Sequence, residues 1–251
     1  MSQAEDYIMG KNPVIEALKG EQSVHKVWVA EGSQRGQMNE VIKQAKKSQV
    51  QLQFVPKKKI DQLAGNSHHQ GVVAQVAAYE YAELNTLFDK ASDRKEAPFF
   101  LLLDELEDPH NLGSLLRTAD AAGVHGLIIP KRRAVGLTSA VAKASAGAVS
   151  HVPVSRVTNL ARTMDDLKKQ GIWFVGTDAK APSDYRELDL SMPVCLVLGS
   201  EGKGLSRLVK EKCDFLVNIP LHGRVTSLNA SVAGSLLMYE VMRKRVPAES
   251  D

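Results

Sequence analysis

The stretch PFFLLLDELEDPHNLGSLLRTADAAGVHGLIIP, residues 98–130, contains two apolar runs separated by a helical pattern. The runs FFLLL and GLIIP carry no alternating polar residues, which is typical of strands buried on both faces of a sheet. A helix between two such strands forms a strand–helix–strand unit, and such units join parallel strands. This stretch therefore predicts an α/β fold with a parallel sheet covered by helices on both faces.

The same alternation continues to the end of the chain. The sequence predicts strands at 151–157, 172–178, 193–200 and 214–221, and helices at 139–149, 159–171, 205–213 and 227–245. In sheets of this kind ligands bind beyond the carboxyl ends of the strands. Three segments occupy that position: EDPHNLGSLLRT (107–118), GSEGKGLS (199–206) and IPLHGRVTSLNAS (219–231).

The amino-terminal part is predicted as a smaller α/β unit. Strands are expected at 24–32, 51–56 and 70–81, with helices at 36–50 and 57–65. The polar segment that follows has little strand pattern and is interpreted as a partly helical linker. We therefore expect an amino-terminal domain (1–78), a linker (79–97) and a second domain (98–251).

Composition narrows the class of protein. Two cysteines, Cys195 and Cys213, lie among apolar residues in a chain of net charge +3. Neither has a neighbour at metal-ligand spacing, so we expect buried free thiols, a cytoplasmic protein and no metal site. No apolar run approaches the ~18 residues of a membrane span, and the first ten residues lack the features of a signal peptide. We therefore expect no membrane partner.

Basic residues are concentrated in the amino-terminal part. Between Lys26 and Ile60 the sequence has eight basic residues and two acidic ones. Such a cluster indicates either a polyanion partner or a solvated helix face with a lysine-rich turn.

Polar residues of the first and third segments allow a structural and a functional interpretation. Asn111 could cap the helix that follows it, and Ser227 and Asn229 could cap the last helix. Asn229 also lies in the small-residue run NASVAGS (229–235), which suggests close packing against a ligand or another chain. Arg117 lies in an otherwise apolar helix. If it is buried it needs a partner, and Asp104 or Glu105 could provide one.

The second segment resembles a ligand-binding loop of an unusual kind. It has three glycines, and Glu201 lies among them. A phosphate-binding loop requires backbone N–H groups and a cation, so a carboxylate does not suit it. The P-loop spacing and the dinucleotide fingerprint are both missing. The seven histidines are scattered, and none stands in a recognisable nucleophile motif.

Together the three segments resemble the SpoU/TrmH family of RNA ribose 2′-O-methyltransferases. The pattern N-x-G-x-x-x-R-T-A at 111–119 is similar to the family's first motif, LVLGSEGKGLS (196–206) to its second, and IPLHGRVTSLNASVAGS (219–235) to its third. The stretches IMGKNPVIEAL (8–18) and HHQGVVAQV (68–76) are similar to the substrate-binding domain of the branch that methylates a guanosine of bacterial 23S ribosomal RNA.

The resemblance implies a fold and a cofactor. It implies a trefoil knot in the second domain, which sequence reasoning alone would reject because knots are rare, and an L30e-like amino-terminal domain. The implied cofactor is S-adenosylmethionine, a sulfonium cation without phosphate, which makes a carboxylate in the loop acceptable. By the resemblance, backbone groups of Gly199, Ile219 and Leu228 hold this cofactor.

The resemblance also implies the chemistry, which is transfer of a methyl group to a ribose 2′-hydroxyl. This hydroxyl must lose or share its proton as it attacks. The family assigns that task to Arg117. A guanidinium normally stays protonated, so either a substrate phosphate helps Arg117 to act as a base, or Arg117 stays charged and stabilises the developing alkoxide. Asn111 would position Arg117 or the ribose, Ser227 and Asn229 would hold the substrate phosphate, and Glu201 would order the loop or face RNA.

Partners follow from the same resemblance. Exposed lysines of the amino-terminal domain would contact the backbone of 23S ribosomal RNA in the peptidyl-transferase region, and these are Lys43, Lys46, Lys47, Lys57, Lys58 and Lys59. Lys131, Arg132 and Arg133 could extend this track. The family implies a homodimer packed through the last helix, in which Leu236, Leu237, Tyr239 and Met242 could face either a partner or their own sheet.

Two other functions are compatible with the sequence. The first is a methyltransferase that acts on transfer RNA, although tRNA enzymes of the family commonly have shorter flanking extensions in place of a separate amino-terminal domain. The second is an RNA-binding protein without catalysis, against which the intact Asn111, Arg117, Ser227 and Asn229 argue.

Overall fold

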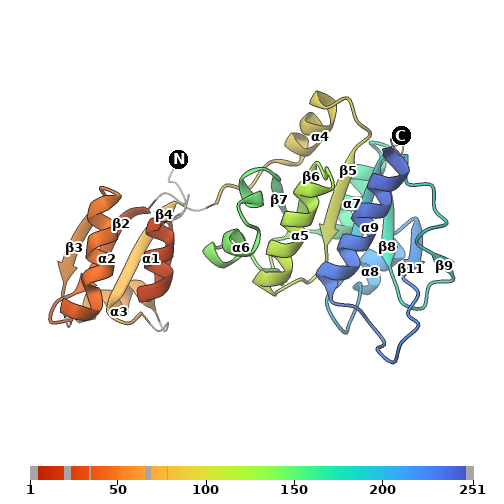
Figure 1. Cartoon of the computed structure of the whole chain (residues 1–251). Coiled ribbons are helices and arrows are strands. Elements are labelled where there is room, and N and C mark those ends of the chain that lie inside the picture. Colours follow the sequence, from red (N-terminus) through yellow and green to blue (C-terminus); the bar gives the residue numbers. More distant parts are fainter. Residues whose placement is uncertain (1–4, 20–23, 34, 66–68, 78, 247–251) are drawn as a thin grey trace, which may run out of the picture. The chain divides into compact units, whose positions relative to one another are not determined.

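The computed structural model describes residues 5–19, 24–33, 35–65, 69–77 and 79–246. The chain forms two compact units, Met1–Glu80 and Tyr81–Asp251. Figure 1 shows the first unit in red and orange and the second in yellow to blue. Each unit has its own sheet and is described by itself.

The amino-terminal unit is a four-stranded sheet with three helices. Its elements are β1 (Glu5–Met9), α1 (Lys11–Lys19), β2 (Val24–Ala30), α2 (Arg35–Lys47), β3 (Gln51–Val55), α3 (Lys57–Ala64) and β4 (Val72–Ala77). The strand order is β1-β4-β2-β3, with β2 and β3 parallel and both β1 and β2 antiparallel to β4. The sequence predicts β2, α2, β3, α3 and β4 correctly, whereas β1 and α1 are not predicted.

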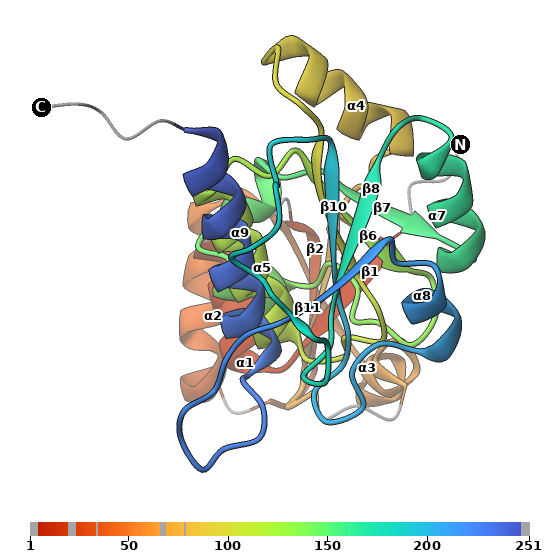
Figure 2. The same cartoon turned by 90° about the vertical axis from the view of Figure 1, so that its right-hand side faces the viewer.

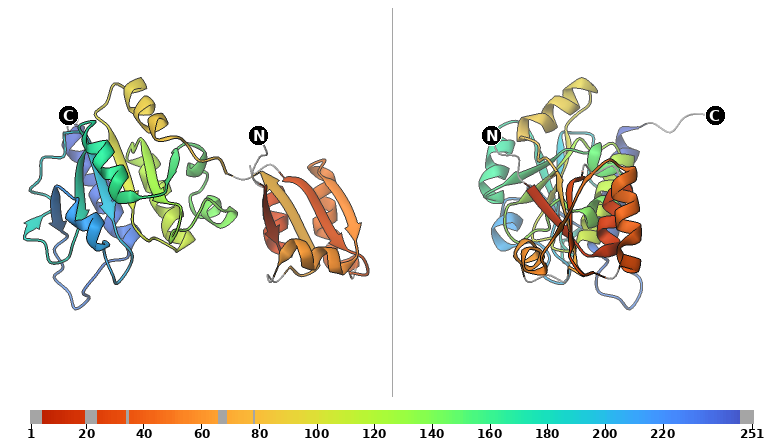
Figure 3. Two further views of the ribbon diagram at one scale, coloured as in Figure 1. Left: turned by 180° about the vertical axis from the view of Figure 1, so that it is seen from behind. Right: turned by 90° about the vertical axis from the view of Figure 1, so that its left-hand side faces the viewer.

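Helices lie on both faces of this sheet. α1 and α2 pack on one face through Val14, Leu18 and Val41, and α3 packs on the other through Ile60 and Ala64. The right-hand view of Figure 3 shows this separation of α1 and α2 from α3.

The second unit has a seven-stranded sheet. Its elements are α4 (Leu84–Asp93), β5 (Phe99–Leu103), α5 (Pro109–Ala121), β6 (Gly126–Pro130), α6 (Ser139–Ala144), η1 (Ala148–Ser150), β7 (Val154–Val157), α7 (Leu160–Lys168), β8 (Trp173–Thr177), β9 (Ser183–Asp184), β10 (Val194–Leu198), α8 (Arg207–Glu211), β11 (Phe215–Asn218) and α9 (Ala230–Arg245). The strand order is β7-β6-β5-β10-β8-β11-β9, and every neighbouring pair is parallel. The predicted parallel sheet is therefore confirmed.

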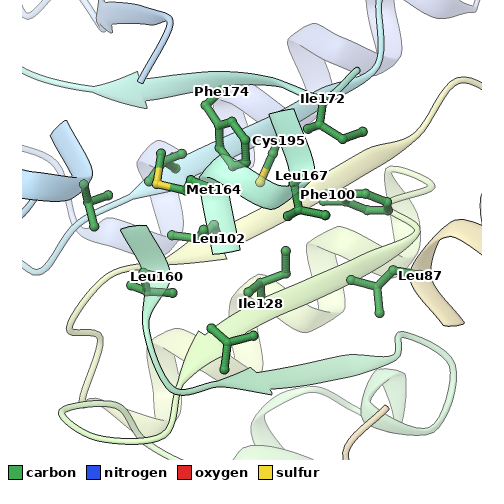
Figure 4. Packing of buried hydrophobic residues seen from close by; sticks show 13 residues of the cluster. Leu87, Phe100, Leu102, Ile128, Leu160, Met164, Leu167, Ile172, Phe174 and Cys195 are labelled. Atoms are coloured by element: carbon green, nitrogen blue, oxygen red, sulfur yellow. The ribbon is translucent and has the colours of Figure 1, made fainter. Parts of the chain in front are cut away.

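Both faces of the sheet are covered, as predicted. Figure 2 shows α5 and α9 on one face and α7 and α8 on the other. Under α7 the core contains Met164 and Leu167, packed against strand residues such as Phe100 and Phe174, and Figure 4 shows this cluster. α6 ends before the expected residue 149, because Ala146 and Gly147 have φ values of 50° and 90°, which no α-helix contains.

The segment expected to be a linker contributes to the core of the second unit. Leu87 of α4 is 1% exposed and belongs to the cluster of Figure 4. A β-carbon added to Gly126 would lie 2.2 Å from Leu87 Cγ, so α4 packs directly on β6. The N–H of Ala82 donates to the Val154 carbonyl at 2.8 Å. The partly helical segment expected to link the two domains is therefore attached to the second unit through Ala82 and α4.

Both cysteines are free, as predicted. Cys195 is fully buried, and burial raises its pKa well above the usual value. Burial also raises the pKa of Cys213 to about 12. The described residues contain no group of three His, Cys, Asp or Glu that could hold a metal ion. Within the same residues, every helix is too short or too polar to cross a bilayer.

Candidate active site at the carboxyl edge of the sheet

Strand order brings the first two candidate segments together. β10 lies between β5 and β8, and Leu198 pairs with Leu103 in parallel register. The chains that leave β5 and β10 therefore start at the same edge of the sheet, although about ninety residues of sequence separate them. The third segment leaves the same edge from β11, the strand beyond β8.

The glycine loop after β10 turns back on itself. Ser200 N donates to Gly204 O at 3.1 Å, and Gly204 N donates to Ser200 O at 2.9 Å. A β-carbon on Gly199 would lie 2.1 Å from the carbonyl carbon of Gly204, so no larger residue fits there. Gly202 has φ +82°, a value that favours glycine. The glycines thus form a tight reversal with Glu201 at its tip.

Glu201 joins the three segments. Its Oε1 accepts hydrogen bonds from Asn111 Nδ2 at 3.0 Å, from Asn229 Nδ2 at 2.5 Å and from the backbone N–H of Ala230 at 3.2 Å. Asn229 Nδ2 also donates to Asn111 Oδ1 at 2.9 Å. Ala230 is the first residue of α9, where the positive end of the helix dipole favours a carboxylate. We call Asn111, Glu201 and Asn229 the amide–carboxylate cluster.

Asn229 has the capping role that its sequence position allows. Its Oδ1 accepts from the backbone N–H groups of Ser231 at 2.9 Å and Val232 at 3.3 Å, which satisfies two donors at the start of α9. The structural and the functional interpretations of Asn229 are compatible, because Oδ1 caps the helix while Nδ2 bonds Glu201. Ser227 is exposed and makes no hydrogen bond to the part of the chain that the structure describes.

The alternative interpretation of Asn111 as a helix cap is wrong. Asp108 caps α5, since its Oδ1 accepts from His110 N at 2.9 Å, and Pro109 occupies the first helical position. Asn111 follows in the first turn and is 6% exposed. Its side chain is therefore free to bond Glu201 and Asn229.

Arg117 is not buried, and the alternative in which it pairs with Asp104 or Glu105 is wrong. Asp104 Oδ2 accepts from Ser206 N at 2.7 Å, and Glu105 Oε1 pairs with Arg133 at 2.8 Å. Arg117 is exposed and makes no hydrogen bond or ion pair with any described residue. It stands three residues after Ser114, on the same side of α5.

Sequence reasoning missed the part that Asp104 plays at the site. Asp104 is 3% exposed, its N–H donates to Leu198 O at 2.8 Å, and its carboxylate accepts from Ser206 N. It therefore ties the end of β5 to both ends of the glycine loop. The signal was its place as the first polar residue after a buried strand.

The small residues of the third segment pack against their own chain. A β-carbon on Gly234 would lie 2.5 Å from both Leu115 and Leu198, and one on Gly113 would lie 2.3 Å from Ala144 Cβ. α9 and α6 therefore approach α5 at distances that only glycine permits. Gly234 therefore packs inside its own chain, whereas the sequence suggested packing against a ligand or another chain.

A hollow lies between α5 and α9. It is lined by Ser114, Ser231, Val232, Ser235, Leu236 and Tyr239. Leu236 and Tyr239 are 39% and 47% exposed, whereas Leu237 is fully buried against the sheet and Met242 is half-buried. Of the four residues expected to face either a partner or the sheet, Leu236 and Tyr239 thus remain available to a partner.

Backbone groups expected to hold a cofactor belong to the second and third candidate segments. Gly199 begins the glycine loop, Ile219 follows β11 and Leu228 immediately precedes Asn229, and all three are half-buried. Within the described residues, no backbone hydrogen bond engages Ile219 or Leu228. Residues 221–227 between them are exposed, including Val225 at 64%.

The six lysines expected to bind RNA do not form one track. All are exposed. Three belong to α2 and three to the start of α3, and these helices pack on opposite faces of the amino-terminal sheet. Lys131, Arg132 and Arg133 are exposed after β6, and Arg133 pairs with Glu105.

Two family profiles match the chain. Residues 98–239 match the SpoU rRNA methylase family, and residues 7–82 match the RNA 2′-O ribose methyltransferase substrate-binding family. The second match ends at residue 82, close to the boundary between the compact units, and the first begins at residue 98. They include all three candidate segments and all of the amino-terminal sheet except the first two residues of β1.

Known proteins resemble this chain over most of its length. A Bacillus subtilis protein, whose name places it in the TrmH family of tRNA/rRNA methyltransferases, is 63% identical over 98% of this chain and 99% of its own length. The crystal structure of an rRNA methyltransferase from Sinorhizobium meliloti with bound AdoMet is 27% identical, with a TM-score of 0.63, over 97% of this chain and 88% of that one. A TrmH/SpoU tRNA-modifying enzyme of A. aeolicus, also 27% identical, has a TM-score of 0.54 over 63% of this chain and 84% of that one.

Proposed function

The chain belongs to the SpoU rRNA methylase family, and on that premise we propose that it methylates the ribose 2′-hydroxyl of a guanosine in 23S ribosomal RNA, with S-adenosylmethionine as the donor. The observation that carries the proposal is the amide–carboxylate cluster. It joins the three segments that the family motifs occupy into one site at the edge of the sheet.

The residues present suit S-adenosylmethionine. The reversal at Gly199 leaves no room for a β-carbon, and the backbone groups of Ile219 and Leu228 are not engaged by other backbone groups in the described residues. The only charged groups in the glycine loop are Glu201 and Lys203, so the loop lacks the concentrated positive charge of a phosphate site. When bound, the cofactor supplies an electrophilic methyl group.

Arg117 acts on the 2′-hydroxyl in this proposal. The guanidinium is exposed and has no protein partner among the described residues, so it is available to the substrate. There it either takes the proton of the hydroxyl with the help of a substrate phosphate or stabilises the developing alkoxide as a fixed cation. Ser227, exposed two residues before Asn229, holds the substrate phosphate.

Glu201 and the two asparagines act as positioning residues. Their hydrogen bonds fix the glycine loop against the starts of α5 and α9. A site held by such bonds keeps reacting groups in one geometry, which is a large part of the rate gain in two-substrate reactions. Asn111 and Asn229 therefore keep the loop and Arg117's helix in register.

The amino-terminal unit binds the RNA. Its match to a substrate-binding family supports this role, and its exposed lysines supply phosphate contacts. Ribosomal RNA is favoured over transfer RNA because the rRNA methyltransferase structure covers 97% of this chain, whereas the tRNA-modifying structure covers 63%.

The working enzyme is a cytoplasmic homodimer. The hollow between α5 and α9 exposes Val232, Leu236 and Tyr239 on a helix face that a second copy would cover. The two free thiols support a reducing compartment.

A methyl-transfer assay tests the function. Labelled S-adenosylmethionine is offered with unmodified 23S ribosomal RNA and, separately, with unmodified transfer RNA, and the product is located by nuclease digestion and mass spectrometry. We expect one 2′-O-methylguanosine in the ribosomal RNA. Label in transfer RNA alone would overturn the substrate but keep the reaction, and label on a base would overturn the reaction.

A further inference from the structure

The sheet of the amino-terminal unit has one face that its helix covers only in part. α3 packs at the end of this face where β2 and β3 finish, with Ile60 against Ala30 and Val55. In Figure 3 α3 lies near one end of the strands. The rest of the face carries side chains that no helix of this unit covers completely.

Strand registers place these side chains in a row across all four strands. Tyr7 of β1 lies opposite Gln75 of β4, Gln75 lies opposite Lys26 of β2, and Lys26 lies opposite Gln51 of β3. Alternate residues of a strand share a face, so Lys26 stands on the same face as Trp28. We call Tyr7, Gln75, Lys26 and Gln51 the polar row.

Contacts confirm that the polar row adjoins an aromatic floor. The rings of Tyr7 and Trp28 are 6.1 Å apart between centroids, and Lys26 Nζ lies 5.2 Å from the Trp28 ring centre. Trp28 is only 8% exposed, whereas Gln51 is exposed and Tyr7, Lys26 and Gln75 are half-buried. The amide, hydroxyl and ammonium groups of the row thus lie above buried aromatic surface.

This combination suits unpaired RNA bases. Single-stranded bases bind by hydrogen bonds to their edges and by stacking on accessible aromatic rings, of which the half-buried Tyr7 offers one. Glutamine amides can donate and accept at the same time. Gln53 of the edge strand β3 lies opposite Trp28, and its side chain is exposed. With Gln51 and Gln75, it gives this face three amide groups. An apolar protein partner would not select three amides and a lysine in these places.

Charge also favours RNA as the occupant. α3 lies on the same face and begins with three exposed lysines, residues 57–59. The polar row and the neighbouring row (Met9, Val73, Trp28 and Gln53) contain no carboxylate. A polyanion with exposed bases matches both features, because lysines bind phosphates and amides read base edges.

We propose that the polar row binds unpaired bases of the RNA substrate, while lysines 57–59 hold the neighbouring phosphates. The proposal rests on the proposed function, since the RNA is taken to be the methyl acceptor. It assigns the choice of target to this face of the sheet, and gives the lysines of α2 on the opposite face at most a non-selective part.

The test compares matched glutamine variants of the full-length protein. Gln51→Ala/Gln75→Ala removes two amides of the polar row, and Gln62→Ala removes an exposed amide of α3 as the control. Binding is measured with an unmodified transcript of the peptidyl-transferase region, and with a fully duplex RNA of the same length. We expect the double variant to bind the looped transcript about tenfold more weakly, with duplex binding unchanged. The control should bind both RNAs as the wild type does.

Lysines 57–59 give an independent readout. Replacing all three with Gln should weaken the binding of both RNAs. It should also make the negative slope of log affinity against log salt concentration shallower by about 2. Gln51→Ala/Gln53→Ala serves as a second row variant, because both side chains are exposed and their loss leaves the core intact. The cofactor affinity and melting temperature of this variant show whether the variant is folded.

Three results would overturn the inference: unchanged binding of the looped transcript by both row variants, equal loss for both RNAs, or a change of oligomeric state with binding unchanged. Failure of the proposed function can be distinguished from failure of this inference. In that case the wild type transfers no methyl group, yet binding to looped RNA still depends on Gln51 and Gln75.

Discussion

Asn111 Nδ2 donates a hydrogen bond to Glu201 Oε1 at 3.0 Å, although ninety residues separate them in sequence. The contact exists because β10 inserts next to β5, so that the segments after both strands share one edge of the sheet. Asn229 closes the cluster from the start of α9. The carboxylate among the glycines is thus a structural bridge between three segments.

The two functions of Asn229 can be separated by a single substitution. Asn229→Asp keeps the oxygen that caps α9 but replaces the amide that bonds Glu201 with a second carboxylate oxygen. We expect methyl transfer to fall about tenfold at pH 8, because like charges at this distance repel by about 1 kcal/mol even in water, and to recover in part at lower pH. Asn229→Ala should in addition lose about 1 kcal/mol of stability with the cap. Full activity of Asn229→Asp would show that the bridge is not needed.

If a second copy covers the hollow between α5 and α9, one charged side chain introduced there should disrupt the dimer. Leu236→Asp places a carboxylate on the exposed apolar face of α9, and we expect it to convert the dimer to a monomer in analytical ultracentrifugation. Leu208→Asp is the matched control, because Leu208 is 62% exposed on α8, away from the hollow. A monomeric wild type, or a dimer that survives Leu236→Asp, would contradict the proposed interface.

Close packing at α5 predicts a steric effect at one glycine. Gly113→Ala brings a methyl group to 2.3 Å from Ala144 Cβ and 2.9 Å from the Val141 carbonyl oxygen. Since backbone must move, we expect a loss of about 1–3 kcal/mol in the free energy of unfolding, measured by chemical denaturation. Gly223→Ala has no atom within 4 Å and should change stability by less than about 0.5 kcal/mol. Equal stability of the two variants would exclude a tight α5–α6 contact.

Buried His125 predicts a loss of stability in weak acid. Its Nδ1 accepts from Phe99 N at 3.0 Å, and burial lowers its pKa below the usual value of about 6.5. Below pH 6.5 the unfolded chain therefore binds a proton that the folded chain resists. The stabilisation present above that pH is lost as the pH falls through the folded pKa.

The His125 effect can be measured in a substituted chain. His125→Gln should remove up to about 1.4 kcal/mol per pH unit from the dependence of unfolding free energy on pH below 6.5. His110→Gln, at an exposed position on α5, should leave it unchanged. The assignment to His125 fails if both variants keep the wild-type dependence.

Most elements of the fold could be predicted from hydrophobic runs, because both faces of the parallel sheet are covered. β1 and α1 were not predicted, since a five-residue edge strand and a short helix with Pro13 in its first turn give weak patterns. The order of the strands in the sheet could not be predicted from the sequence either. The position of β10 between β5 and β8 depends on contacts between segments far apart in sequence.

The residues of the site could be predicted from the sequence, but their contacts with one another could not. Asn111, Glu201 and Asn229 could be selected from their segments, but only the structure shows that Asp108 caps α5 and leaves Asn111 free. Asp104 was considered only as a partner for Arg117, because its bond to a backbone N–H of the glycine loop leaves no trace in sequence. The separation of the six lysines onto two faces of the amino-terminal sheet could not be predicted either, because it depends on how α2 and α3 pack.

The measurement that tests the central claim most directly is single-turnover methyl transfer by Arg117→Ala. The substrate is unmodified 23S ribosomal RNA, the donor is labelled S-adenosylmethionine, and cofactor affinity is measured in parallel. Arg117 is exposed on α5 and does not support the fold through any hydrogen bond or ion pair with the described residues. We therefore predict a rate at least about 100-fold below wild type with cofactor affinity within about twofold. A rate within about threefold of wild type would contradict the assignment of Arg117 to the 2′-hydroxyl.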